Sequence, residues 1–184
     1  MSFPTEYAQK LRTTLDSIPL SRVDELIEIF RAARDEDRQI FVCGNGGSAA
    51  TANHFACDIV KGASLGRDKR FRIQALSEQV PTMTAYANDV GYDVVFAEPL
   101  RNFARPGDLV LIITGSGNSP NVLKALEVGR ELGCKTVALT GRGGGKAAPL
   151  ADFLIEVDDT HMGRVEDAHM VITHMVGYHF MERE

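Results

Sequence analysis

The stretch Asp108-Leu-Val-Leu-Ile-Ile-Thr-Gly-Ser-Gly-Asn-Ser-Pro120 indicates the fold class of this chain. Residues 108–113 form an apolar run with the length and the branched side chains of a buried strand. A polar, glycine-rich segment follows at 114–119, and Pro120 suits the first turn of the helix predicted over 120–132. A strand that leads through a glycine loop into a helix is typical of parallel α/β proteins.

The same alternation continues on both sides of this stretch. Further strands are predicted at 39–43, 71–76, 135–140 and 153–157. Helical segments are predicted between and after them, at 46–60, 81–88, 94–103, 147–151 and 163–184. Strands that alternate with helices imply a central parallel sheet with helices on both faces, which is a three-layer α/β sandwich.

Two amphipathic helices, predicted at 7–20 and 23–34, precede the first strand, and Ser21 is the expected N-cap of the second helix. These helices have little core of their own. We therefore expect residues 1–37 to be an extension that packs on the α/β body or on a neighbouring subunit. No linker or repeat divides the 184 residues, which predicts a single domain over 1–184.

The composition is that of an ordinary globular protein, with 44% hydrophobic and 24% charged residues. The net charge of −5 gives no reason to expect a nucleic acid or an acidic membrane surface as a partner. No apolar run is long enough to span a bilayer, and the first residues do not resemble a signal peptide. The widely spaced Cys43, Cys57 and Cys134 make no disulfide framework. We therefore expect a cytoplasmic protein.

The segment Gly44-Asn-Gly-Gly-Ser-Ala-Ala50 connects the first predicted strand to the next helix. Glycines let the backbone approach a ligand, and the helix N-terminus offers free N–H groups with a partial positive charge. The segment is neither a Walker loop, which needs a following Lys and Ser or Thr, nor the GxGxxG dinucleotide fingerprint. A tight turn that needs glycine only for packing explains it equally well.

The second glycine-rich loop carries three hydroxyl groups, on Thr114, Ser116 and Ser119, just before a helix N-terminus. Hydroxyls and backbone N–H groups that converge in this way suit a phosphate monoester. The alternative is a simple helix start with Ser119 as its N-cap. Two such loops at the carboxyl ends of parallel strands favour a ligand crevice. The third glycine-rich segment, 140–145, is interpreted as a flexible turn despite its Arg142.

Candidate acid, base and metal-binding side chains lie on two predicted helices. His54 and Asp58 are four residues apart, on one face of the helix after the first glycine loop. On the last helix, Glu166 and His174 point about 80° apart and can face one cleft. Two histidines and two carboxylates suit either a Zn²⁺ ion or proton transfer, although their spacing does not show that the helices meet. The other histidines are interpreted as structural or solvated: His161, His169 and His179.

Together these segments resemble the sugar isomerase (SIS) domain family and, within it, the phosphoheptose isomerases. The resemblance covers most of the chain and rests on several segments in order: Gly44-Asn-Gly-Gly-Ser-Ala49 with His54-Phe-Ala56, Asn88-Asp-Val-Gly-Tyr92, Ser116-Gly-Asn-Ser119 with Asn121-Val122, and Arg164-Val-Glu-Asp-Ala-His169 with His174. It implies the conversion of sedoheptulose 7-phosphate to D-glycero-D-manno-heptose 7-phosphate through an enediol. It also implies a homotetramer of nucleotide-binding-like α/β subunits, with sites built between subunits.

The resemblance also implies roles for single residues. Asp58 and His174 match the catalytic base and acid of the family. The positions that match its Zn²⁺ ligands, one ion per subunit, are His54, Asp58, Glu166 and His174. Those that match its substrate-binding residues are Asn45, Gly46, Gly47, Asp58, Asn88, Asp89, Glu166 and, around the phosphate, Thr114, Gly115, Ser116 and Ser119.

The chain departs from the family pattern near these positions. Asp58 stands where Glu is usual, Glu166 stands where Gln is usual, and Lys61-Gly62 replaces a segment that commonly contains Arg. These differences leave open the exact sugar phosphate, the binding of a metal, and the choice between Asp58 and Glu166 as the base. Two other functions also stay open: a non-catalytic tetrameric regulator of the kind that binds a replication initiator, and an isomerase of another sugar phosphate.

Overall fold

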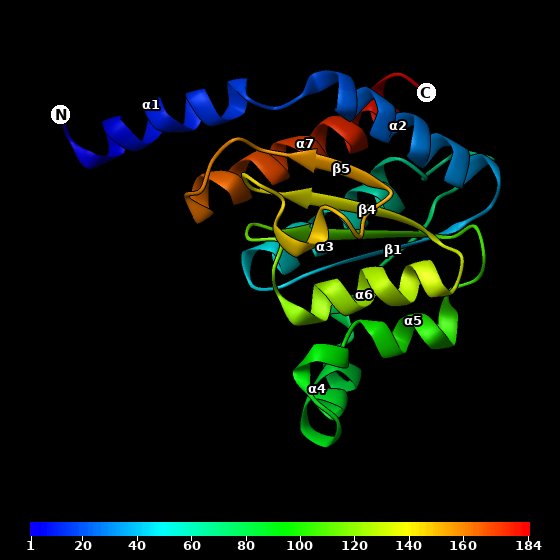
Figure 1. Cartoon of the computed structure of the whole chain (residues 1–184). Coiled ribbons are helices and arrows are strands. Elements are labelled where there is room, and N and C mark those ends of the chain that lie inside the picture. Colours follow the sequence, from blue (N-terminus) through cyan, green and yellow to red (C-terminus); the bar gives the residue numbers. More distant parts are fainter.

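A computed structural model describes the whole chain, Met1–Glu184. Its centre is a sheet of five parallel strands: β1 (Gln39–Gly44), β2 (Arg72–Ala75), β3 (Leu109–Thr114), β4 (Lys135–Thr140) and β5 (Phe153–Glu156). Helices cover both faces of this sheet (Figure 1). The predicted three-layer α/β sandwich is thereby confirmed.

The strands lie in the order β2-β1-β3-β4-β5, so the direction of winding reverses between β1 and β3. Open α/β sheets bind ligands at such a switch point, outside the carboxyl ends of the two strands. The register places Gly44 of β1 opposite Ile113 of β3. The two glycine loops start at the ends of these strands, so they lie side by side.

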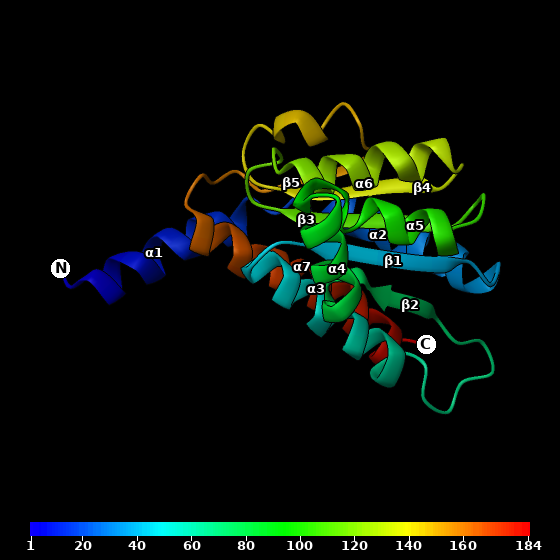
Figure 2. The same cartoon turned by 90° about the horizontal axis from the view of Figure 1, so that it is seen from below.

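Alternate residues of β1, β3 and β4 belong to two separate cores. On β1, Ile40 and Val42 share a core with residues of α2 (Leu20–Asp35), α3 (Gly47–Cys57) and α7 (Met162–Glu182). Phe41 and Cys43 share the other core with residues of α5 (Ala97–Phe103) and α6 (Pro120–Glu131). Figure 2 shows these helices on either side of the sheet. Because successive side chains of a strand point to opposite faces, a continuous apolar run is needed to fill both cores.

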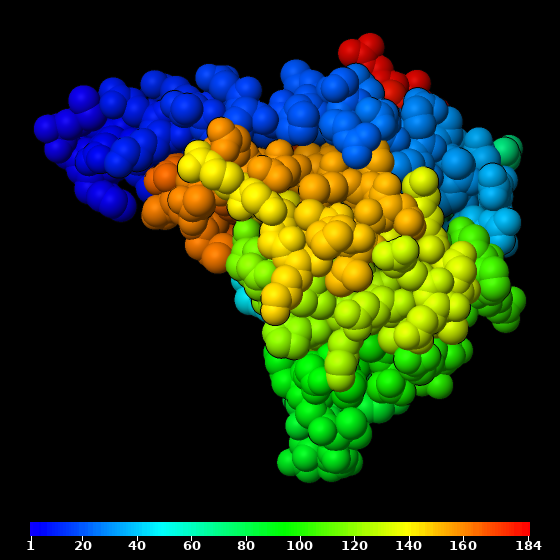
Figure 3. Space-filling model, viewed as in Figure 1, coloured from blue at the N-terminus to red at the C-terminus, as the bar shows by residue number.

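Two helices project from the body. α1 (Phe3–Asp16) buries only Thr14, and α4 (Val80–Asp89) buries no residue at all. Figure 3 shows both segments as extensions of the main mass, the first in dark blue and the second in green. Apolar side chains such as Phe3 and Val80 stay exposed on them. Since short helices gain most of their stability from packing, these faces are suited to contact with another surface.

Some boundaries predicted for the N-terminal helices are wrong. The two helices run over Phe3–Asp16 and Leu20–Asp35, so Ser21 lies inside α2 and does not cap it. Pro19 occupies the last non-helical position instead. The ring of Pro19 and its missing N–H group are tolerated at this position but not in a helix interior. The helix α2 therefore starts directly after Pro19.

Other predicted helices are shorter than expected. The helix predicted at 46–60 ends as an α-helix at Cys57 and continues as a π-helical turn, Asp58–Gly62. The segment predicted at 94–103 is divided into a 3-10 turn, Tyr92–Val94, and α5. Only a 3-10 turn, Gly145–Ala147, stands near the helix predicted at 147–151. Among all the helices, none combines the length and the apolar character that crossing a lipid bilayer requires.

Candidate functional site

The two glycine loops enclose a cavity at the carboxyl ends of β1 and β3. Its volume is about 240 Å³. Both loops and the first turns of α7 line it, with Asn45, Gly46, Gly47, Ser48, Ile113, Thr114, Gly115, Ser116, Ser119, Met162 and Glu166. All the loop residues assigned to the substrate by the resemblance are among them. Sequence reasoning missed Ser48, Ile113 and Met162. Ser48 has a hydroxyl group in the first glycine loop that could have identified it, whereas Ile113 and Met162 do not differ in residue type from residues of the core.

Each glycine of the first loop has its own structural reason. A Cβ atom on Gly44 would lie 2.7 Å from the backbone oxygen of Ile113, so packing alone requires glycine there. Gly46 has a φ of +54°, in the left-handed region, and no atom lies within 4 Å of its Cβ position. A Cβ atom on Gly47 would lie 2.5 Å from a carboxylate oxygen of Glu166. The packing interpretation therefore suits Gly44, whereas the backbone at Gly46 is open to a ligand.

The hydroxyl groups of the second loop differ in their availability. Thr114 Oγ1 accepts a hydrogen bond from Gly117 N (3.2 Å), and Ser116 Oγ accepts one from Asn118 N (3.2 Å). Both hydroxyls thus hold the loop in shape as acceptors, and each keeps its own hydrogen for donation. Ser119 occupies the N-cap position of α6, but its side chain makes no capping hydrogen bond. Its hydroxyl is free to donate to an anion at the helix N-terminus.

The third glycine-rich segment packs against the second loop. Gly117 has a φ of +64°, and a Cβ atom there would collide with the backbone oxygen of Gly144. Ala147 N donates to Gly117 O at 3.0 Å. Arg142, the one residue of this segment that suggested an anion site, is ion-paired with Asp158. The segment is therefore a turn that supports the second loop.

His54, Asp58 and His174 come together where the end of α3 packs beside α7. Asp58 Oδ2 lies 3.3 Å from His54 Nε2 and 3.8 Å from His174 Nε2, and the two Nε2 atoms are 2.9 Å apart. Asp58 begins the π-helical turn that follows α3, a kind of turn often found at functional sites. The side chains of His54 and His174 are 49% and 41% exposed, so a ligand can reach the group.

The chemistry of these three side chains suits a metal ion. Two imidazole nitrogens and one carboxylate oxygen lie within 4.8 Å of one another and could hold a divalent cation. Catalytic Zn²⁺ sites commonly use three such protein ligands and keep a further position for water or substrate. Glu166 is not part of this group. It lines the cavity of the glycine loops, about two turns of α7 before His174.

Asn88 and Asp89 lie apart from the cavity within one chain. Both are exposed at the end of the projecting α4, where Asn88 Nδ2 donates to Asp89 Oδ1 at 2.8 Å. Asp89 lines a different, open cavity of about 440 Å³ with residues of α4. A single chain therefore does not bring these two residues to the glycine loops.

The remaining histidines take positions that agree with their structural interpretation. His169 is completely buried in α7, and this burial lowers its pKa to about 4. His161 is the N-cap of α7 and accepts a hydrogen bond from Arg164 N at 3.5 Å. His179 lies against the Arg31 guanidinium, with 3.0 Å between Nε2 and Nη2. None of them faces the cavity of the glycine loops.

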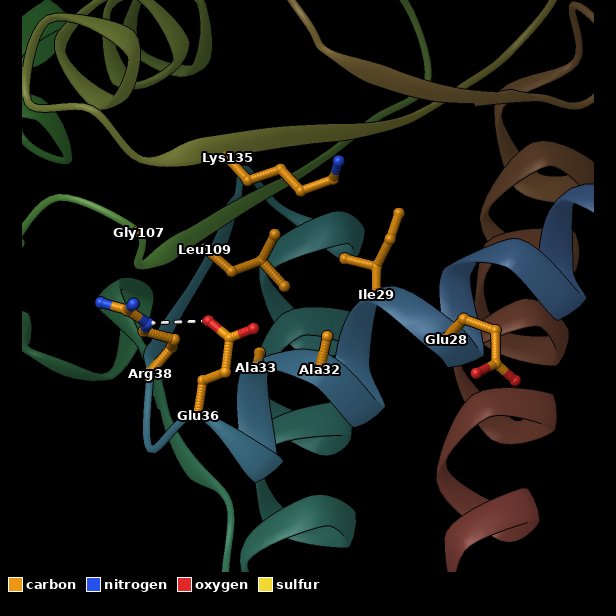
Figure 4. A pocket seen from close by; sticks show the side chains of 9 residues that line it. All are labelled: Glu28, Ile29, Ala32, Ala33, Glu36, Arg38, Gly107, Leu109 and Lys135. Atoms are coloured by element: carbon orange, nitrogen blue, oxygen red, sulfur yellow. Dashed lines mark hydrogen bonds and ion pairs between the residues drawn. The ribbon is translucent and has the colours of Figure 1, made fainter.

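A third cavity, of about 350 Å³, lies at the other end of the strands, beside the amino ends of β3 and β4. Figure 4 shows its lining, with Ala32 and Ala33 of α2 facing Leu109. Two of its charged side chains, Glu36 and Arg38, are paired with each other at 3.3 Å. This cavity has neither a glycine loop nor a helix N-terminus, so it lacks the converging donors of the first.

Comparison with known proteins places this chain in a family. The model of the SIS domain family matches residues 6–141, which is most of the chain. The structures of two phosphoheptose isomerases superpose closely on the structure of this chain. That from Neisseria gonorrhoeae has a TM-score of 0.87 at 31% identity and covers 96% of this chain and 95% of that one. That from Francisella tularensis has a TM-score of 0.86 over the full length of both chains, and at 23% identity it supports the fold alone.

Sequence relatives narrow the class further. The phosphoheptose isomerase of Mycobacterium tuberculosis is 44% identical over 156 residues, which cover 85% of this chain and 77% of the relative. The probable phosphoheptose isomerase of Thermoplasma volcanium is 39% identical over 172 residues, or 93% of this chain and 85% of the relative. The chain therefore belongs to the SIS domain family and, within it, to the phosphoheptose isomerases.

Proposed function

We propose that this protein is an aldose–ketose isomerase that converts sedoheptulose 7-phosphate to D-glycero-D-manno-heptose 7-phosphate through an enediol. The observation that carries the proposal is the placement of the His54–Asp58–His174 group relative to the glycine loops. α3 starts at the first loop, and its rise from Gly47 to His54 is about 10 Å. That length is comparable with an open seven-carbon chain whose phosphate lies at the loops.

The second loop is the proposed phosphate site. The free Ser119 hydroxyl and the N-terminus of α6 offer directional donors, and the dipole of α6 favours an anion. Thr114 and Ser116 shape this loop through their hydrogen bonds to backbone N–H groups. Asn45 and Gly46 of the first loop then face the carbon chain of the sugar. This arrangement binds the phosphate without any lysine or arginine in the cavity.

Proton transfer is assigned to Asp58, in the π-helical turn that follows α3, and to His174 of α7. Asp58 acts as the base, which takes the proton from the carbon next to the carbonyl and returns it to the former carbonyl carbon. His174 acts as the acid, which moves a proton between the two oxygens. Glu166 is the alternative base, because its carboxylate lies in the cavity itself.

A Zn²⁺ ion is proposed at His54, Asp58 and His174, one per subunit. Their nitrogen and oxygen donors fit this ion, and they lie close enough together to share it. Bound there, the ion would supply a positive charge that polarises a carbonyl oxygen. In one chain Glu166 lies outside this set, so its role as a fourth ligand would need its side chain or the substrate to bridge the gap.

We further propose that the protein is a cytoplasmic homotetramer. The exposed apolar faces of α1 and α4 have nothing to cover them in one chain. An α4 from a neighbouring subunit would also bring Asn88 and Asp89 to the cavity of the glycine loops. Three free cysteines fit a reducing compartment.

Isomerase assays with a panel of sugar phosphates test the proposed function. Asp58→Asn and His174→Ala should each lower kcat by about 10²–10⁴-fold, the usual effect of losing a positioned proton-transfer group. Asp68→Asn, at an exposed aspartate, is the matched control. If the wild type isomerises no sugar phosphate, or both variants work normally, the assignment fails and a regulatory role takes its place.

A further inference from the structure

Two asparagines and one tyrosine form a hydrogen-bonded network beside the cavity. Asn45 belongs to the first glycine loop, Asn121 lies in the first turn of α6 and is only 1% exposed, and Tyr92 starts the 3-10 turn after α4. Asn45 Nδ2 donates to Asn121 Oδ1 and Asn121 Nδ2 donates to Asn45 Oδ1, both at 2.8 Å. Tyr92 Oη donates to Asn45 Oδ1 at 3.1 Å.

A backbone group fixes the orientation of every amide in this network. Val122 N lies 3.0 Å from one side-chain atom of Asn121, and a backbone N–H can only donate. Val122 N also donates to Ser119 O at 3.2 Å, and of the two Asn121 side-chain atoms only Oδ1 can accept the second branch of this hydrogen bond, so the Asn45 atom that faces it is Nδ2. The reciprocal bond then leaves Asn45 Oδ1 as the acceptor, and the Tyr92 hydroxyl has to donate to it. Neither amide can be reversed without placing two donors or two acceptors together.

The network leaves Asn45 with one unused group. Both lone pairs of its Oδ1 accept hydrogen bonds, from Asn121 and from Tyr92, and one of its two Nδ2 hydrogens is bonded to Asn121. The second Nδ2 hydrogen remains, on a partly exposed residue that lines the cavity. Asn45 can thus offer a ligand a donor but no acceptor. A sugar phosphate presents mainly oxygen atoms, which a fixed donor can recognise.

We propose that Asn121 and Tyr92 are positioning residues that hold Asn45 as a hydrogen-bond donor to an oxygen of the bound sugar phosphate. The inference rests on the proposed function, because that function defines the ligand. Tyr92 is half exposed, and the ion pair between its neighbour Asp93 and Lys124 links this turn to α6. A donor fixed before binding avoids the entropic cost of ordering it in the complex.

A double-mutant cycle on kcat/KM tests this proposal. Asn121→Ala and Tyr92→Phe should each lower kcat/KM for sedoheptulose 7-phosphate by about 10-fold, the effect of about one hydrogen bond. In the Asn45→Ala background the same changes should have no further effect, because both residues act through Asn45. Asn102→Ala, at an exposed asparagine of α5 outside the network, is the control and should retain wild-type kinetics.

The outcomes separate this inference from a purely structural role. If Asn121 and Tyr92 only stabilise the fold, their effects on kcat/KM should be the same with and without Asn45, which would overturn the proposal. Tyr92→Phe keeps the test valid if Asn121→Ala does not fold, since it removes a single hydroxyl. If the wild type isomerises no sugar phosphate, the proposed function fails by itself. The NMR signals of the Asn45 side-chain amide then decide the network, which is refuted if Asn121→Ala leaves them unshifted.

Discussion

Replacement of Ser119 by alanine distinguishes a helix cap from a phosphate site in the second glycine loop. The Ser119 side chain makes no capping hydrogen bond, so Ser119→Ala should change the free energy of unfolding by less than about 0.5 kcal/mol. A serine that did cap α6 would be worth about 1 kcal/mol. Urea unfolding of the two proteins at one pH measures this difference.

The effect on binding should be much larger than the effect on stability. A hydrogen bond to a charged phosphate contributes about 1.5–3 kcal/mol, and each 1.36 kcal/mol corresponds to a factor of ten. Ser119→Ala should therefore raise KM by about 10- to 150-fold. Because the phosphate does not react, the bond has similar strength in the ground state and the transition state, and kcat should change little.

Thr114→Val is the informative comparison. It removes the oxygen that accepts a hydrogen bond from Gly117 N, so it should lower the stability of the loop as well as raise KM. Initial rates over a range of sedoheptulose 7-phosphate concentrations give both kinetic constants. A wild-type KM for a folded Ser119→Ala protein would refute the phosphate assignment, and a loss of about 1 kcal/mol in stability would restore the helix-cap interpretation.

The remaining predictions concern metal, assembly and pH. Elemental analysis should find one Zn²⁺ per chain that is lost in His54→Ala, whereas a metal-free wild type that zinc does not activate would contradict the metal site. Light scattering at micromolar concentration should give the mass of a tetramer, and a monomer would exclude a site shared between subunits. The Arg164 guanidinium, which donates to Asp159, lowers the pKa of that carboxyl in the folded state. The ionised Asp159 carboxylate therefore stabilises the folded protein above the unfolded pKa of an aspartate, about 3.9. This contribution to the free energy of unfolding is lost as the pH falls from that value toward the lower pKa of the folded state. Urea unfolding between neutral pH and pH 3 should show this loss, and Asp159→Asn should reduce it.

Much of the fold could be predicted because its signals are local. The apolar run at 108–113 and the glycines that follow it specify a buried strand and its turn without reference to the rest of the chain. Helix ends were harder to predict. Ser21 is a good N-cap by residue type, but Pro19 had already set the boundary of α2. The π-helical turn at Asp58–Gly62 was not predicted from the sequence, and it lies where the end of α3 contacts α7.

The sequence by itself determined the fold class, the two glycine loops and the residues able to transfer protons or bind a metal. Only the tertiary structure decided which of these residues meet. It brought His54 and Asp58 to His174, which lies more than a hundred positions further along the chain, and it placed Glu166 in the cavity of the glycine loops instead. It also showed that the Thr114 and Ser116 hydroxyls accept hydrogen bonds from the backbone of their own loop, whereas the Ser119 hydroxyl makes no capping hydrogen bond. The physical reason is that residue type and spacing fix the direction of a side chain on its own helix or loop. The distance between two helices, and the hydrogen bonds left over, follow only from the packing of the whole domain.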